Sequence, residues 1–149
     1  PYWSDDIRGG FFGLRLAHDH RHLVRAVLEG VAYSLRHLLD IFAEVGAPIT
    51  EIALAAGGTH TPGWPQIFAD ACRRPVAVYA GQETVTRVLY ALCREHLGEG
   101  DFETSLQRTF SEPVMFLPDP AVSGVYEDGY QRYRAFARFA AAQAGLGQL

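Results

Sequence analysis

The stretch Glu51-Ile-Ala-Leu-Ala-Ala-Gly-Gly-Thr-His-Thr-Pro-Gly-Trp-Pro-Gln66 predicts a buried strand, a glycine turn and the first turn of a helix. The run from Ile49 to Ala56 is short and mostly apolar, as is typical of a strand that is buried on both faces. Gly57 and Gly58 remove side chains where the chain must turn and where a ligand can approach the backbone. We therefore expect the rest of the fold to be arranged around this strand and turn.

A helix is expected to begin directly after the glycine turn. Thr61 suits the N-cap of this helix, and Pro62 suits its first position. A helix N-terminus presents unpaired N–H groups and the positive end of the helix dipole, which favour a phosphate or a polar ring edge. From these residues alone, either a nucleotide contact or a plain strand-to-helix connection that uses glycine for its geometry is possible.

Hydrophobic periodicity predicts further elements on both sides of this stretch. In chain order, we expect a helix from Asp19 to about Val45, a helix ending near Cys72, a strand at 76–79, a helix from Thr84 to about Gly98, a short helix from Asp101 to about Phe110, an extended stretch at 116–120 and a helix at 124–142. Residues 11–16 fit either a short strand or an ordered loop. The alternation of strands and helices predicts an α/β fold with a mixed or parallel sheet and helices packed on it.

The first long helix is expected to be amphipathic. The residues expected to face the core form an apolar stripe: Val24, Leu28, Val31, Leu35, Leu38, Leu39 and Phe42. The opposite face is expected to be solvated and carries Arg25, Glu29, Tyr33 and Arg36. Arg25 and Glu29 stand four residues apart and are expected to form a solvated pair. Gly30 costs about 1 kcal/mol relative to Ala in mid-helix, so we expect another backbone to pack closely there.

Composition and charge narrow the class of protein. The 149 residues are 48% hydrophobic and 20% charged, with a net charge of −4, which is ordinary for a soluble globular domain. We expect no nucleic-acid partner and no membrane span, because there is no basic stripe and no run of 18 apolar residues. A chain that begins at Pro1, without Met, is expected to be a piece of something longer.

Residue types exclude several chemistries. All 13 basic residues are arginine, which excludes a Walker lysine and a Schiff-base lysine from this chain. Cys72 and Cys93 lack CxxC spacing and are expected to be buried free thiols in a reducing cytoplasm. No serine lies in a nucleophile-elbow context, so a hydrolase triad has no support. Three aspartates, Asp40, Asp70 and Asp101, are each expected at a helix surface or cap, without a paired carboxylate.

The histidines near the start of the first long helix invite a metal interpretation. Only His18 and His22 can share a helix face, whereas Asp19 and His20 point elsewhere. A third ligand with recognisable spacing is missing, so we expect a polar helix start and assign no metal-binding residue.

Four segments, taken together and in order, resemble the C-terminal domain of the FGGY carbohydrate kinases, most closely the xylulokinases. Residues 1–11 resemble the end of the family's "ERTPxWDPxARGAF" stretch, and residues 18–32 resemble its "HTRAHLxRAVLEGVA" helix. Residues 57–76 are similar to "GGGxxSPLWxQIxAD…RPV". Pro118-Asp-Pro120 and the tyrosines that follow resemble the C-terminal tail, so the likeness spans nearly the whole chain.

The resemblance implies an actin-like, ribonuclease-H-like ATPase domain with a mixed sheet and flanking helices. Residues 1–149 would then form a single domain, most of the C-terminal, nucleotide-binding half of a two-domain sugar kinase. The family transfers the γ-phosphate of ATP, with Mg²⁺, to a sugar hydroxyl, so the implied substrate is a ketose or a polyol. The residues implied to lie against the adenosine are Gly57, Gly58, Thr59, His60 and Pro62.

The remaining machinery is implied to lie outside this chain. The general-base aspartate, most of the sugar pocket and the phosphate-binding Gly-Thr turn belong to the N-terminal domain or to residues upstream of Pro1. Phosphoryl transfer depends on such groups for positioning and charge neutralisation. The chain alone is therefore expected to be inactive, with its own N-terminal domain as partner and a cytoplasmic location.

At two positions the chain departs from the family pattern. Ala56 stands where the family has the first glycine of its triplet, and Arg87 replaces the glycine of an "LGAA" helix start. Either Arg87 points into the nucleotide cleft, toward phosphate, or the local packing is rebuilt. The alternative function is a degenerate, non-catalytic actin-like module used for binding or dimerisation, and the tyrosine-rich terminal helix could serve a homodimer.

Overall fold

The structure is a computed structural model and describes residues 5–55, 57, 61–79, 84–110 and 112–145. Its helices and strands follow one another in this order: α1 (His20–Glu44), β1 (Ile52–Leu54), α2 (Trp64–Cys72), β2 (Val76–Val78), α3 (Thr84–His96), α4 (Phe102–Gln107), β3 (Val114–Phe116), the 3₁₀ turn η2 (Pro120–Val122) and α5 (Ser123–Gln143). The predicted helices are confirmed within a few residues of their expected ends.

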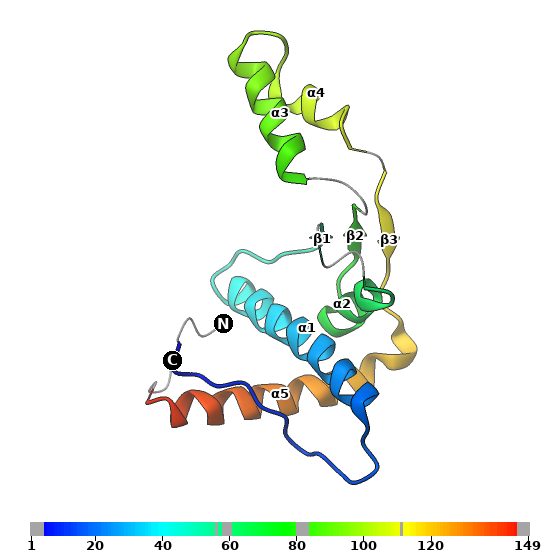
Figure 1. The fold of residues 1–149 in the computed structure, drawn as a ribbon, viewed down its shortest axis with the longest axis vertical. Coiled ribbons are helices and arrows are strands. Elements are labelled where there is room, and N and C mark those ends of the chain that lie inside the picture. Colours follow the sequence, from blue (N-terminus) through cyan, green and yellow to red (C-terminus); the bar gives the residue numbers. More distant parts are fainter. Residues whose placement is uncertain (1–4, 56, 58–60, 80–83, 111, 146–149) are drawn as a thin grey trace.

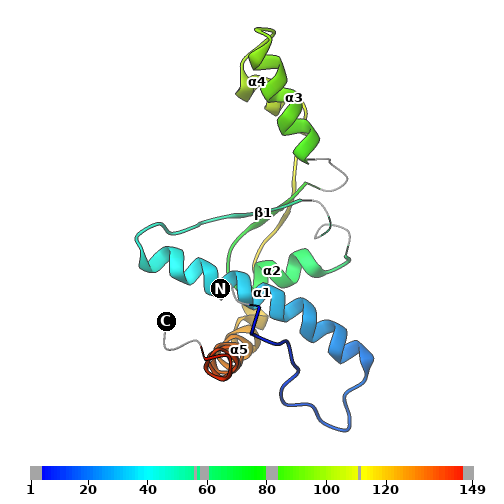
Figure 2. The same cartoon turned by 60° about the vertical axis from the view of Figure 1, so that its left-hand side comes forward.

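The strands separate two groups of helices. Figures 1 and 2 show α1, α2 and α5 gathered on one side of the strands, while the α3–α4 hairpin stands at the opposite end of the molecule. Within the described ranges, no helix combines the length and the apolar character that crossing a membrane requires. Residues 11–16 form a loop, which settles that open choice.

The three strands form a small mixed sheet in the order β1-β2-β3, as the α/β pattern predicts. β1 pairs in parallel with β2, with Ile52 opposite Val76, and β2 pairs antiparallel with β3, with Val78 opposite Val114. All three residues of β2 are buried, as a central strand requires. The third strand was not predicted, because only the extended stretch from Phe116 onward was expected there, and β3 ends at Phe116.

The expected orientation of α1 is confirmed only in part: Leu28, Leu35 and Leu39 of the apolar stripe pack in the core. Two residues of the face expected to be solvated also lie inside, since Tyr33 is buried and the Arg36 side chain is only 11% exposed. Much of the apolar stripe lies outside instead: Val24 is 59% exposed and Val31 45%. Gly30 has open space where a close backbone was expected. The inward side of α1 therefore combines part of the apolar stripe with Tyr33 and Arg36, and Arg36 lies inside because it contacts Glu127 of α5.

Arg36 joins three helices. Its Nη2 donates to Oε2 of Glu127 on α5 at 2.6 Å, and its Nη1 donates to the backbone oxygen of Ala71 on α2 at 3.2 Å. The guanidinium also lies over the ring of Tyr130, 4.0 Å from its centre. These contacts satisfy a nearly buried cation, so Arg36 stabilises the inward orientation of α1.

A cluster of tyrosines fills the space between α1 and α5. The ring of Tyr33 lies 5.9 to 6.3 Å from the ring centres of Tyr126, Tyr130 and Tyr133 on α5. The hydroxyl of Tyr130 donates a hydrogen bond to the carboxylate of Asp40. Asp40 therefore binds a core residue and is not a simple surface residue. Burial raises the pKa of Tyr33 and of Tyr130, so both hydroxyls stay protonated.

Glu127 is expected to make the stability of the chain depend on acid pH. Hydrogen bonds from Gln131 and Arg36 lower its pKa from the ordinary 4.5. The carboxylate of Glu127 therefore takes up a proton more readily in the unfolded state than in the folded state. Its contribution to the free energy of unfolding is complete above its unfolded pKa and is lost as pH falls through its folded pKa. Urea unfolding at about pH 6 and about pH 3 measures this loss. In Glu127→Gln the drop should be smaller; an equal drop in both proteins would contradict the assignment.

The apolar side chains of α3 are largely exposed. Val85 is 72% exposed, Leu89 55% and Leu92 46%, and Cys93 is exposed as well, because α3 packs mainly on α4. Of the two cysteines, only Cys72 is the buried free thiol that was expected. Burial raises the pKa of Cys72 to about 12.

Candidate functional site

The central strand and helix form as predicted, but the helix starts later. The N-cap of α2 is Gly63 and not Thr61, because Gly63 takes a left-handed backbone with φ of 78° that favours glycine. Thr61 accepts a hydrogen bond from the backbone N–H of Trp64 at 3.2 Å, and Pro62 lies in the resulting turn. Among the described residues, no side chain caps the first turn of α2.

The five residues predicted to contact adenosine are only partly placed. Gly57 is exposed, and a Cβ built on it would meet no atom of the described residues within 4 Å. Pro62 is exposed and lines the pocket described next. The other three, Gly58, Thr59 and His60, lie outside the described residues, as does Ala56.

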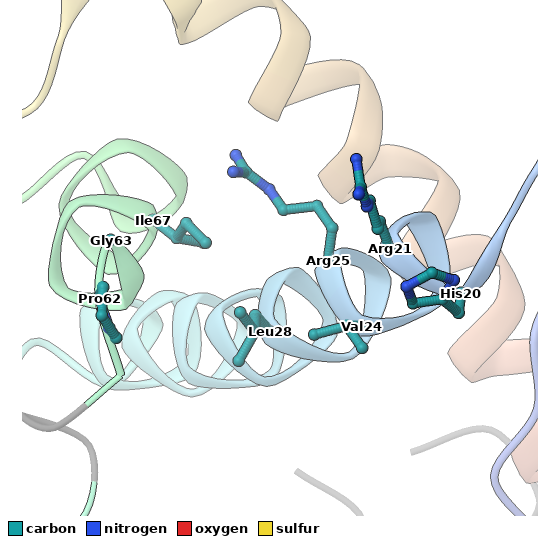
Figure 3. A pocket seen from close by; sticks show the side chains of 8 residues that line it. All are labelled: His20, Arg21, Val24, Arg25, Leu28, Pro62, Gly63 and Ile67. Atoms are coloured by element: carbon teal, nitrogen blue, oxygen red, sulfur yellow. The ribbon is translucent and has the colours of Figure 1, made fainter.

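A pocket of about 290 Å³ lies between the first half of α1 and the start of α2 (Figure 3). Its lining residues are His20, Arg21, Val24, Arg25, Leu28, Pro62, Gly63 and Ile67. The five residues from α1 were missed as site residues by sequence reasoning, because nothing local connects them with a turn some forty residues away. The only signal for them was the family-like stretch at 18–32, which carried no residue role.

The lining combines apolar side chains with cations. Figure 3 shows Arg21 and Arg25 extending to the same side of α1. Arg25 is fixed in place, because its Nε donates to Glu29 at 2.6 Å and its Nη2 donates to the hydroxyl of Tyr126 at 2.6 Å. The predicted Arg25–Glu29 pair is thus confirmed, although it also ties α1 to α5. Such a lining suits a ligand with an apolar body and a negative group.

Trp64 fixes the start of α2 against α1. Its indole Nε1 donates to the backbone oxygen of Leu28 at 3.1 Å, and its ring lies 5.2 Å from that of Phe68. The turn that contains Pro62 is therefore held on a packed helix.

Asp70 anchors the far half of α2 and is not the surface residue that was expected. It is buried, and its Oδ1 accepts hydrogen bonds from the side chain of Gln66 and from the backbone N–H of Asp119, both at 2.8 Å. Gln66 also donates to the backbone oxygen of Leu117 at 2.8 Å. These bonds attach the segment between β3 and η2 to α2.

The histidines at the start of α1 serve the helix end. His18 and His22 do share a side, with ring centres 5.1 Å apart, but Nδ1 of His22 contacts the carboxylate of Asp19 at 2.7 Å. Asp19 accepts from the backbone N–H groups of Arg21 and His22, and so caps α1 as predicted. Hydrogen bonding to His22 lowers the pKa of Asp19. Over the described ranges, no three His, Cys, Asp or Glu side chains are grouped to hold a metal ion.

Arg87 packs on its own chain. Its guanidinium lies over the ring of Phe110, 5.4 Å from the ring centre, and Phe110 also contacts Tyr79 edge-on at 5.5 Å. This contact supports the rebuilt local packing, and the position of Arg87 relative to a nucleotide stays a prediction.

Comparison with known proteins agrees with the resemblance. Residues 1–87 match the C-terminal domain of the FGGY family of carbohydrate kinases. The chain is 35% identical over 85 residues to gluconokinase from Bacillus subtilis. These aligned residues make up 56% of this chain and 17% of that protein. It is 37% identical over 70 residues to xylulose kinase from Escherichia coli, covering 47% and 14% respectively.

Among solved structures, xylulose kinase from Rhodospirillum rubrum is similar with a TM-score of 0.72 at 25% identity, over 91% of this chain and 28% of that one. The chain therefore spans less than a third of the length of these relatives. The family match covers more than half of the chain and includes the central strand, the turn and α2. The chain belongs to the FGGY family of carbohydrate kinases.

Proposed function

We propose that this chain is part of an ATP-dependent carbohydrate kinase and supplies the adenosine side of its active site. The observation that carries the proposal is the strand, glycine turn and helix at 52–72, which lie within the family match and leave Gly57 open to a ligand. In this proposal, residues 1–149 form most of an actin-like C-terminal domain, and Gly57, Gly58, Thr59, His60 and Pro62 contact the nucleotide.

The proposed reaction is transfer of the γ-phosphate of ATP to a hydroxyl of a ketose or polyol, as in a xylulokinase. Bound Mg-ATP would supply the phosphoryl group and the cation that neutralises its charge. Glycine at position 57 lets backbone lie flat against a purine, and the hydrogen bond from Trp64 to Leu28 holds the start of α2, with Pro62 before it, against α1. We assign the general base, the phosphate-binding turn and most of the sugar pocket to an N-terminal domain.

Saturable binding of Mg-ATP and Mg-ADP to the chain is expected in calorimetric titration. Gly57→Val should abolish it, because valine would cover backbone that the purine needs, while the open space around residue 57 lets the fold accept the side chain. Gly124→Val is the matched control, since its Cβ also meets nothing within 4 Å but lies on α5. Equal affinity in all three proteins would contradict the proposed site.

The same preparation is expected to show no sugar-dependent ATP turnover, because the catalytic base is assigned elsewhere. Turnover by the isolated chain would overturn that assignment.

A second candidate function, a non-catalytic module for binding or dimerisation, is favoured by the packing of Arg87 on Phe110. Absence of nucleotide binding, even when an N-terminal domain is present, would support this alternative.

A further inference from the structure

The pocket between α1 and the start of α2 connects the core with the surface. Ile67 in its lining is 4% exposed and Leu28 packs against the core, whereas Val24 is 59% exposed. The volume of about 290 Å³ lies just below the usual range for ligand sites, which is about 300 to 1,000 Å³. The pocket therefore suits a small molecule with an apolar part.

The charged part of the lining is cationic. It includes Arg21 and Arg25, and among the described residues the lining contains no aspartate or glutamate. These two arginines stand four residues apart, so they are neighbours on the surface of α1. No described residue forms an ion pair or a hydrogen bond with the guanidinium of Arg21, so its N–H donors are available to a ligand.

Arg25 is already held in position by its neighbours. Its Nε and Nη2 donate to Glu29 and to the hydroxyl of Tyr126, both at 2.6 Å, and its Nη1 has no such partner in the described part of the chain. The side chain is 54% exposed, so a ligand can reach it. Because Glu29 neutralises part of the charge of Arg25, Arg21 supplies most of the attraction for an anion.

We propose that this pocket binds a small organic anion that carries an apolar chain. The carboxylate or phosphate of the ligand accepts hydrogen bonds from Arg21 and from Nη1 of Arg25, since guanidinium groups recognise both kinds of anion. Figure 3 shows the two arginine side chains extending to the same side of α1. The apolar chain of the ligand lies against Val24, Leu28 and Ile67, the apolar part of the lining.

This anion site is separate from the proposed adenosine site. The two share only Pro62, and Gly57, which carries the adenosine proposal, is not among the lining residues of the pocket. The ligand also differs from ATP in having an apolar chain beside its negative group. The anion site therefore does not rest on the proposed function.

The test is an NMR titration of the chain with hexanoate and with hexyl phosphate, followed through the methyl signals of Val24, Leu28 and Ile67. Hexanol and inorganic phosphate are the controls, because each carries only one half of the proposed ligand. Saturable shifts of these methyl signals are expected, with an affinity at least about tenfold higher than for hexanol or inorganic phosphate. Saturation by only hexanoate or only hexyl phosphate would support the site and identify its anion.

Arg21→Gln should weaken binding of the anionic probe about tenfold, because a charge-assisted hydrogen bond is lost. Its unfolding midpoint should stay that of the parent, since no described residue depends on this guanidinium. Arg138→Gln is the matched control: Arg138 is also exposed and has no ion pair with a described residue, but it lies on α5. This variant should bind the probe as the parent does.

The proposal is overturned by the absence of saturable shifts, by shifts confined to methyl groups outside the pocket, or by equal affinity for hexanol or inorganic phosphate. Equal affinity in Arg21→Gln and the parent, or an equal loss in both arginine variants, would also overturn it. Gly57→Val should keep the affinity for the probe while it loses Mg-ATP. Loss of the probe in that variant would make the pocket part of the nucleotide site, whereas probe binding without any ATP binding would contradict only the proposed function.

Discussion

Gly129→Ala is expected to destabilise the chain by about 2 kcal/mol, although the same change in an open helix stabilises by about 1 kcal/mol. Gly129 lies in the middle of α5 and faces Tyr33 of α1. A Cβ at this position would lie 2.8 Å from Cζ of Tyr33 and closer still to its hydroxyl oxygen. Real Cβ atoms do not approach other atoms this closely, so one of the two helices must shift.

The Tyr33 ring cannot move aside at low cost. It is 7% exposed and lies among the rings of Tyr126, Tyr130 and Tyr133. A displacement would therefore disturb the whole contact between α1 and α5. Because closely packed cores resist added volume, the energy of overpacking should exceed the gain in helix propensity.

Urea unfolding of Gly129→Ala, with Gly124→Ala as control, measures this effect. Gly124 lies on the same helix, but its Cβ would meet nothing within 4 Å, so alanine there should leave stability unchanged or raise it. Adding Tyr33→Phe removes the nearest atom and should restore part of the loss in Gly129→Ala, as a coupled pair requires. A Gly129→Ala protein as stable as the parent would show that the two helices are not in contact at this point.

Local patterns in the sequence were sufficient to place most elements. Asp19 and Asp101 have side chains that accept backbone hydrogen bonds at the starts of α1 and α4, as their positions before apolar periodic runs predicted. The strand with Ile52 and the strand with Val76 pair in parallel, as strands joined by a helix generally do. These features depend on residues close together in the chain, which is why one sequence reveals them.

The orientation of the helices could not be predicted in the same way. On α1, apolar Val31 is exposed, whereas the charged side chain of Arg36 is only 11% exposed, because Glu127 and Ala71, far away in the sequence, satisfy the guanidinium. A hydrophobic stripe indicates a face to be covered, but it does not say which partner covers it. Leu89 on α3 shows the same limit, since it is 55% exposed on a helix that packs mainly on α4.

The candidate site was predicted in part for the same reason. Gly57 and Pro62 were chosen because the turn chemistry is local; both are exposed, Pro62 lines the pocket, and their contact with a nucleotide stays a prediction. Arg21 and Arg25 line the pocket only because α1 crosses the start of α2. This is a contact between distant segments, which no local sequence pattern encodes. The N-cap moved from Thr61 to Gly63 because only the second position takes the left-handed backbone that this turn requires.

Asp70→Ala is expected to cost about 3 kcal/mol of stability, because two hydrogen-bond donors would lose their acceptor inside the protein. The carboxylate is 7% exposed, and it accepts from the backbone N–H of Asp119 and from the side chain of Gln66. The backbone donor belongs to the segment that links β3 to η2, so its loss should also loosen the entry to α5. Stability is measured by urea unfolding, and loosening by amide exchange at residues 117–122.

Asp70→Asn separates the hydrogen bonds from the charge. Asparagine keeps the Oδ1 acceptor for both donors, and it gives up only the extra strength of bonds to a charged group, so it should cost about 1 kcal/mol. The loss in Asp70→Ala should persist at high salt, because it comes from unpaired donors and not from long-range charge. If alanine and asparagine are equally destabilising, the charge and not the pair of hydrogen bonds is what Asp70 contributes. If neither destabilises, Asp119 and Gln66 find other acceptors, and α2 is held by its apolar contacts alone.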